Sequence, residues 1–423
     1  MTPQASADLA DRVLPLIRTR AELYRWRASN AHGAQMHEAV DIIEASMASM
    51  AFTEPKEVHG VTTKAIASAM KVVARADDSS GIIGDACRRL LALHPRTARA
   101  ARVPAAALVK WMVSFQFDGD VDFFELDPVA YAPALGELGI ARYRKELAAV
   151  EAQLGPRPSE DARWSSAHSH DWFVLDWNEK RLAVLDHDIE AIIRTHARDR
   201  RVAAWLHDTA KAFEEIGEID LAIDWARQAA RFDRGHQAQR AADYLAALLA
   251  AHRPAELLQE RLNTFRRWPS SSTAAQLYDV TGSAWPEYAS EVDERLAPSP
   301  RDAVLFTLLT LNDVPRAWHL AHELGLSEAD TWTRIATAYE KVDALAVLPV
   351  LERLARGDLT EADAKRYRAA AVRLDRMRAI ATGTSHAGDV DELIAELRLA
   401  NRHRPRLQQE FDRVGLPPVR LQG

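Results

Sequence analysis

The sequence has a single cysteine, Cys87, among its 423 residues. One thiol cannot form an internal disulfide, and it cannot supply the thiolates of a cysteine-rich zinc site. We therefore expect a reducing compartment, the cytoplasm. The chain also lacks an uninterrupted apolar run of the roughly 20 residues that a membrane span requires. Its first residues, MTPQASADLADRVLP, bring acidic side chains before any apolar run, which is unlike a secretory signal.

Residues that favour β-sheets are also scarce. Aromatic residues make up 7% of the chain, and no long run of valine, isoleucine, threonine or tyrosine alternates with a period of two. Alanine, leucine, arginine, glutamate and aspartate dominate instead, and most of these favour helices. The composition therefore predicts an all-α protein. A net charge of −7 argues against a protein that binds nucleic acid over its whole surface.

The spacing of apolar residues along the sequence predicts two helical regions. Residues 1–155 form an N-terminal helical domain, in which DDSSG at 77–81 is typical of a helix cap. Residues 156–178 are rich in proline, serine and tryptophan and form a crossover. His168, His170 and Asp171 lie there, but the segment shows no further ligand and no metal is predicted. From residue 179 to 423, short helices alternate with turns and must stack to bury their apolar faces.

Residues 205–233 carry the clearest repeat unit. Leu206, Ala210 and Phe213 share one face of a first helix, and Gly217 permits a tight turn. The second helix then presents small and aromatic residues at helical spacing: Ala222, Trp225, Ala226 and Ala229. These residue types and spacings are typical of a tetratricopeptide unit, and weaker pairs follow at 244–265, 303–324 and 331–354. We therefore expect an α-solenoid over residues 179–423.

The chain resembles a known group of bacterial proteins. IATAYEKVDALAVLPVLERLA, RYRAAAVRLDRMRAI and NRHRPRLQQEFDRV are similar to the helical region that follows the finger in SWIM-type zinc-finger proteins. ADDSSGIIGDACRRLLALH and FFELDPVAYAPALGELGIARYRKEL resemble a related, uncharacterised helical family whose members lack the finger. The likeness covers about residues 76–411 and implies architecture, not activity. A SWIM finger needs several cysteines, so the zinc and nucleic-acid binding proposed for it do not carry over.

LHDTAK at 206–211 offers a competing interpretation, because it resembles the metal-binding core of HD-type phosphohydrolases. His207 and Asp208 would be the central ligands, with His187 as an earlier and Asp279 as a later ligand. However, Ala210 replaces the glycine of that motif, and the motif falls wholly inside a repeat unit whose second half matches independently. The HD reading is therefore the alternative, and a non-enzymatic scaffold is preferred.

The solenoid interpretation gives the first helix a binding face. His207, Lys211, Glu214 and Glu215 lie opposite the apolar face, on the side that is concave in tetratricopeptide arrays and lines a peptide groove. We expect a protein partner there. No phosphate-binding loop, nucleophile elbow or other catalytic constellation occurs, and no cofactor is predicted.

A basic cluster near the C-terminus gives a third interpretation. It could contact nucleic acid, but a solenoid needs a polar cap at its end, and we favour the cap. The cluster consists of Arg398, Arg402, Arg404 and Arg406.

Overall fold

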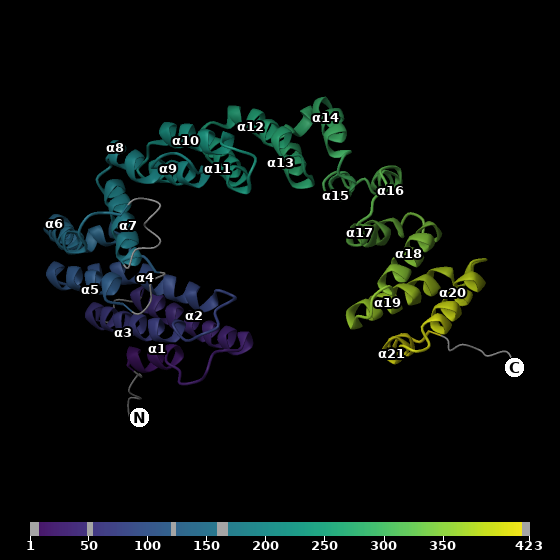
Figure 1. Ribbon diagram of the computed structural model, residues 1–423, viewed down its shortest axis with the longest axis horizontal. Helices are drawn as coiled ribbons and strands as arrows, with labels where there is room; N and C mark the ends of the chain where they lie inside the picture. Colours follow the sequence, from purple (N-terminus) through teal and green to yellow (C-terminus); the bar gives the residue numbers. More distant parts are fainter. Residues whose placement is uncertain (1–7, 49–53, 120–123, 159–167, 417–423) are drawn as a thin grey trace, which may run out of the picture. The chain divides into compact units, whose positions relative to one another are not determined.

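The computed structural model describes residues 8–48, 54–119, 124–158 and 168–416, and these ranges are helical throughout, without a β-strand (Figure 1). A single isolated bridge between Leu23 and Ala76 is the only extended pairing within them. The all-α prediction is confirmed. None of the described helices is long and apolar enough to cross a lipid bilayer. Part of the predicted crossover, residues 159–167, lies outside the described residues.

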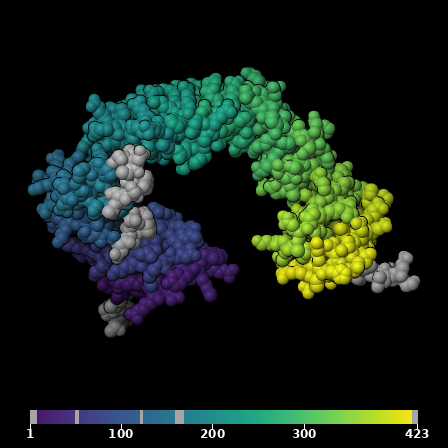
Figure 2. All heavy atoms as spheres, viewed as in Figure 1, coloured from purple at the N-terminus to yellow at the C-terminus, as the bar shows by residue number. Residues whose placement is uncertain are grey.

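Backbone contacts divide the chain into two compact units, Met1–Ala229 and Ala230–Gly423, called here the first and the second unit. The predicted domain limits at residues 155 and 179 stay a prediction. Within each unit, side chains fill the spaces between neighbouring ribbons (Figure 2).

The helices of the first unit pack on their neighbours in sequence and also on the helix after the next. In chain order they are α1 (Leu9–Ile17), α2 (Trp26–Ala48), α3 (Pro55–Val73), α4 (Ile82–Ala100), α5 (Ala105–Phe117), α6 (Pro128–Leu154), α7 (Ser169–Leu185), α8 (Ile189–Ile192), the π-helix η2 (Ile193–Ala197), α9 (Ala203–Glu215) and α10 (Ile219–Arg231).

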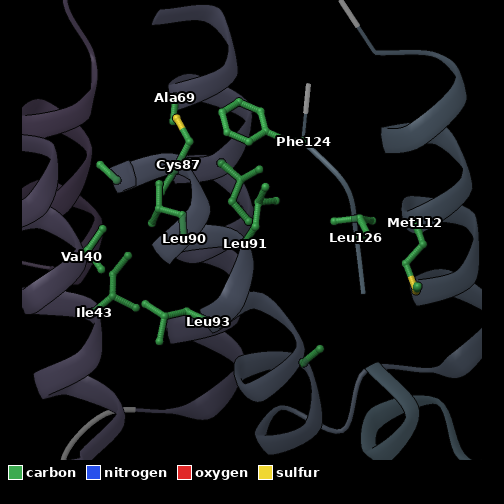
Figure 3. Close-up of a cluster of buried hydrophobic side chains, with 14 of the residues drawn as sticks. Val40, Ile43, Ala69, Cys87, Leu90, Leu91, Leu93, Met112, Phe124 and Leu126 are labelled. Atoms are coloured by element: carbon green, nitrogen blue, oxygen red, sulfur yellow. The ribbon is translucent and has the colours of Figure 1, made fainter. Parts of the chain in front are cut away.

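The apolar core of the first unit gathers around α4 (Figure 3). Cys87 and Leu90 of this helix are fully buried, beside Val40 and Ile43 of α2 and Ala69 of α3. Burial raises the pKa of the Cys87 thiol to about 12. The single thiol of the chain is therefore a neutral core side chain rather than a nucleophile.

The predicted cap of α4 is present. The Asp78 carboxylate accepts hydrogen bonds from the backbone N–H groups of Ile83 (2.9 Å) and Gly84 (2.7 Å), which have no partner within the helix. Helix α2 packs closely against the start of α4. A β-carbon at Gly33 of α2 would lie 2.5 Å from a methyl group of Ile82 of α4. Only glycine allows the two helices to approach so closely.

A buried histidine links three helices of this core. His94 of α4 is 1% exposed, and its ring stacks on Trp111 of α5 with 3.8 Å between centroids. Its Nδ1 lies 3.0 Å from the Tyr131 hydroxyl, and its Nε2 lies 3.2 Å from Thr63 Oγ1. The Thr63 hydroxyl donates to the His59 carbonyl and therefore accepts from His94 Nε2–H. This arrangement suits a neutral imidazole.

A second buried polar network joins α5, α6 and α7. The Gln116 amide donates to the Tyr143 hydroxyl (2.7 Å), which donates to the Asn178 carbonyl oxygen (2.7 Å). The Asn178 amide donates in turn to the Gln116 carbonyl oxygen (3.0 Å) and closes the ring. We call these three residues the amide–phenol triangle. All three are at most 4% exposed, so their hydrogen bonds replace those that water would make.

The second unit continues with shorter helices that also pack on sequence neighbours. These are α11 (His236–His252), α12 (Pro254–Arg267), α13 (Ser271–Thr281), the 3-10 turn η3 (Gly282–Ala284), α14 (Pro286–Leu296), α15 (Pro300–Leu309), α16 (Val314–Glu323), α17 (Ala329–Tyr339), η4 (Leu345–Val347), α18 (Leu348–Asp358), α19 (Ala364–Ala381), α20 (Ala387–Ala400) and α21 (Pro405–Arg413).

Two apolar clusters hold the second unit together, and α15 belongs to both. Phe306 of α15 packs with Phe265 and Leu277, whereas Val304 belongs to the cluster that contains Trp332 and Leu374. Both α15 side chains are at most 1% exposed. Because they leave the same helix towards different clusters, α15 couples the helices before it to those after it.

The buried His94 predicts a loss of stability in acid. Burial is the main cause that lowers its pKa from 6.5 to about 3, and His59 adds to it. Between these values the unfolded chain binds a proton that the folded chain does not, so stability falls as pH decreases from 6.5. We expect His94→Asn to reduce the slope of unfolding free energy against pH by up to about 1.4 kcal/mol per pH unit. Urea unfolding at pH 4–8 measures it. The exposed His252→Asn is the control, and parallel slopes for wild type and His94→Asn would contradict the argument.

Candidate functional site

A groove with charged walls lies on the first unit between α6, α7, α8 and η2. It consists of adjoining cavities of about 470 Å³ and 390 Å³ that share Arg157, Glu179 and Arg194. We call it the charged groove. Apolar side chains from three helices contribute to its lining: Leu147, Ala148, Leu175, Leu182, Ala183 and Ala191. Its volume lies in the range of sites that bind small ligands or peptide side chains.

Charges of both signs line the groove, and they neutralise one another. Arg144 contacts both carboxylate oxygens of Asp186 at 2.7 Å. The Arg157 guanidinium lies 3.3 Å from Asp176 and from Glu179. Burial lowers the pKa of Arg157, but these carboxylates outweigh it and the pKa is raised. The groove therefore presents alternating positive and negative groups with little excess of either sign.

The backbone beside the groove is unusual. Residues Ile193–Ala197 form a π-helix, a feature that is rare and frequent at functional sites. It ends at Arg198, whose φ of 48° lies in the left-handed region that side chains rarely adopt, and Arg200 follows with φ 60°. Such positions cost about 1–3 kcal/mol each and persist only where the surrounding structure enforces them. The bend turns Arg194 and Arg198 towards the groove that they line.

Burial beneath the π-helix holds its histidine neutral. His196 is 6% exposed, and its Nδ1 lies 3.1 Å from the Ile192 carbonyl oxygen. Burial and then the charge of Lys180 lower the pKa of His196 to about 4. The buried His196 therefore packs beneath η2 and does not enter the groove. The arginines Arg144 and Arg157 that line the groove are already ion-paired. The groove suits binding better than proton transfer.

One arginine connects the groove helix α7 with α6 and α9. The Arg181 guanidinium contacts Asp127 at the start of α6 (2.9 Å) and Glu215 at the end of α9 (2.6 Å). Its side chain is 12% exposed. Arg181 is two residues from both Glu179 and Ala183, so at about 100° per residue it lies on the side of α7 turned away from the groove.

The four residues predicted as a binding face all lie on α9. Leu206, Ala210 and Phe213 are buried as predicted, while Lys211, Glu214 and Glu215 are exposed and His207 is half-buried. Glu215 has a structural partner in Arg181, which the sequence analysis did not foresee. The ion pair connects α9 to α7. The assignment of the four residues to a binding face stays a prediction.

The geometry gives no support to the HD interpretation. Asp208 is exposed and lies 4.0 Å from Lys211, and His187 sits in the turn after α7 with φ 54°. Asp279 belongs to the second unit. Among the residues that the structure describes, no group of three or more His, Cys, Asp or Glu side chains is arranged to hold a metal ion.

The C-terminal arginines are not a single surface cluster. Arg398 is 5% exposed, and its guanidinium contacts Asp412 (2.6 Å) and the Leu416 carbonyl (2.9 Å). Arg404 donates to the Leu359 carbonyl (2.7 Å). Of the four, only Arg402 and Arg406 are exposed. Two of the four therefore fasten α20 and α21 to their surroundings, which weakens the case for a nucleic-acid surface there.

The charged groove is not evident from the sequence. Its residues come from positions 144–199, and their proximity follows from helix packing that no local pattern reveals. One signal was present: RTHARDRR at 194–201 holds four arginines within eight residues. Two of them, Arg194 and Arg198, line the groove, and their spacing of four residues is one that places side chains on the same side of a helix.

These features define a helical protein with an open charged groove and no metal-binding cluster in its described ranges. The chain belongs to a family of unknown function (DUF6880), whose model matches residues 2–276. The match includes the whole first unit from residue 2 and the start of the second. No curated protein matches the chain.

The ion pair of Glu215 predicts a structural effect at the supposed binding face. We expect Glu215→Gln to lower the unfolding free energy by about 1–2 kcal/mol, because Arg181 is mostly buried and loses one of its two carboxylates. Glu38→Gln on α2, which is exposed and has no partner among the described residues, should change it by less than about 0.5 kcal/mol. Thermal and urea unfolding measure the difference. Equal effects would show that the Arg181–Glu215 contact contributes nothing.

Proposed function

We propose that this chain is a non-enzymatic adaptor that holds a segment of a partner protein in the charged groove. The observation that carries this proposal is the combination of apolar lining and paired charges in one open cavity of about 470 Å³. A peptide presents the same combination, with apolar side chains beside acidic and basic ones.

The paired charges give the groove a means of selecting its partner. A partner carboxylate can take the place of Asp186 on Arg144, and a partner guanidinium can take the place of Arg157 beside Glu179. Each exchange replaces one ion pair with another, so it adds little affinity by itself. A segment with the wrong order of charges would leave both partners unpaired, which is costly. The apolar lining then supplies most of the affinity.

A solenoid of tetratricopeptide-like helix pairs is part of the proposal. Its support is that α11 packs on α12, α15 on α16 and α18 on α19, each helix on its neighbour in sequence. The resemblance to the region after the finger in SWIM proteins stays a prediction, as does the cytoplasm as the place of action. The burial of Cys87, the only thiol, agrees with a reducing compartment but does not require one.

Filling the groove should prevent partner binding. Ala148 lines the groove and is exposed, whereas Ala149 is also exposed but is not among the groove's lining residues. Arginine is a good helix former, so Ala148→Arg and Ala149→Arg add the same charge and bulk to α6 without breaking it. We expect Ala148→Arg to reduce recovery of the partner at least about tenfold, and Ala149→Arg to leave it unchanged. Tagged protein purified from its host, with quantitative mass spectrometry, measures both.

The two arginine variants separate the groove from the rest of the surface. A protein that is retained by wild type and Ala149→Arg but lost with Ala148→Arg supports the proposal. Equal recovery with both variants would remove the groove as the site. Melting temperatures of the two variants show whether either change disturbs the fold.

The exposed face of α9 makes a competing prediction for the same purification. Exchanging the charges in the double variant Lys211→Glu/Glu214→Lys leaves Glu215 and its contact with Arg181 intact. If the partner binds at α9, recovery falls with no loss of melting temperature, because exposed charges contribute about 0–1 kcal/mol to stability. If recovery is unchanged while Ala148→Arg abolishes it, the groove alone is the binding surface.

A further inference from the structure

The second unit contains a cavity that, unlike the charged groove, is lined by more basic than acidic side chains. It has a volume of about 470 Å³ and lies between the C-terminal end of α10, the helix α11 and the second half of α12. We call it the arginine cavity. All its lining residues belong to the second unit, which begins with Ala230 and so includes the last two residues of α10. Among them are four arginines and one carboxylate: Arg231, Arg234, Arg266, Arg267 and Glu260.

Two of these arginines are held by the protein. Arg266 forms a bidentate ion pair with Glu291, at 2.7 Å for each bond. Arg267 has no carboxylate partner; its Nε donates to the Asp233 carbonyl oxygen at 3.1 Å. The guanidinium of Arg267 also lies over the Trp268 ring, 5.1 Å from its centroid. Arg267 is therefore fixed in place with its positive charge uncompensated by an acidic side chain.

The other two arginines have no protein partner. Among the described residues, the side chains of Arg231 and Arg234 make no hydrogen bond and no ion pair. The backbone that carries them is nevertheless ordered by contacts, since Trp268 Nε1 donates to the Arg234 carbonyl oxygen at 2.9 Å. Three guanidinium groups thus face one cavity without a carboxylate of their own.

The one carboxylate in the lining, Glu260, forms no ion pair with Arg231, Arg234 or Arg267. Other negative groups nearby are already engaged or too weak to neutralise the cavity. The Asp233 carboxylate accepts from the Gly235 N–H at 2.8 Å. Glu291 is shared between Arg266 and Arg295, and its pKa is lowered to about 2, chiefly by the hydrogen bond from Arg266. The C-terminal ends of α10 and α12 favour cations here, but each is equivalent to only about half a negative charge.

The cavity also contains a buried polar group that the protein does not use. Thr264 lines it and is 2% exposed, and its hydroxyl has no hydrogen-bond partner in the described part of the chain. Threonine in a helix commonly donates to the carbonyl four residues earlier, as Thr307 does in α15. The hydroxyl of Thr264, at the wall of the arginine cavity, does not make this hydrogen bond.

We propose that the arginine cavity binds a phosphate group of a small anionic ligand. A guanidinium presents parallel N–H donors that match two phosphate oxygens, and it remains charged at any physiological pH. Arg231 and Arg234 can close on the anion, while Arg267 provides a fixed positive charge. The volume admits a ligand larger than a single phosphate, with the Trp268 ring at its edge. This site is independent of the charged groove, which has no such excess of positive charge.

Pyrophosphate is the probe for this proposal, titrated into the full-length chain by calorimetry at low and at physiological salt. The double variant Arg231→Gln/Arg234→Gln removes the two arginines that have no structural contact, so its melting temperature should match that of wild type. Arg334→Gln on α17, an exposed arginine outside the cavity, is the charge-matched control for one substitution. We expect saturable binding to wild type, weakened about tenfold or more by the double variant and unchanged by Arg334→Gln.

Each possible result of these titrations either supports or overturns the phosphate site. Saturable binding that is lost only when Arg231 and Arg234 are replaced supports the site. No saturable heat with wild type overturns it. Equal weakening by Arg334→Gln also overturns it, because general attraction to positive charge would then explain the binding. A parallel titration with a single-stranded oligonucleotide covers the remaining case: if the oligonucleotide binds through Arg231 and Arg234 but pyrophosphate does not, the small-ligand proposal is wrong.

Discussion

The position of α7 is the constraint on which the first unit depends. On one side, Asn178 closes the amide–phenol triangle with Gln116 and Tyr143, and all three are buried. On another side, Arg181 reaches α6 and α9 through two carboxylates. A buried network is stable only when each member is satisfied, so a rotation of α7 would break several bonds together. The remaining side of α7 is therefore presented to the charged groove in one fixed register.

Two kinds of electrostatic environment distinguish the two candidate sites. In the charged groove, Arg144 and Arg157 face carboxylates, so the free protein has no unbalanced charge to stabilise. In the arginine cavity, Arg231 and Arg234 form no ion pair although one carboxylate, Glu260, also lines it, and like charges held together destabilise the folded chain. The first arrangement favours partners that reproduce an order of charges. The second gains free energy from any anion that fits, which points to a different class of ligand.

The sequence revealed what depends on local spacing and concealed what depends on distant partners. Burial of Leu206, Ala210 and Phe213 followed from helical periodicity, and the cap by Asp78 followed from residue type. Glu215 looked identical to its neighbour Glu214, because its partner Arg181 lies 34 residues away. The groove was hidden for the same reason, with an added one: a π-helix at Ile193–Ala197 has no recognisable residue pattern.

The strained backbone and the charged groove coincide in the first unit, and the coincidence has a physical consequence. Asp176 is buried to 9% exposure and lies near both Arg157 and Arg198, the residue whose positive φ ends the π-helix. These ion pairs help to keep the strained backbone in place, and they also form the wall of the groove. A ligand that competes for Asp176 or Glu179 would therefore loosen the contacts that hold η2. Because linkage is reciprocal, the conformation of η2 must in turn affect affinity in the groove. The unusual backbone is thus part of the wall of the charged groove rather than a defect beside it.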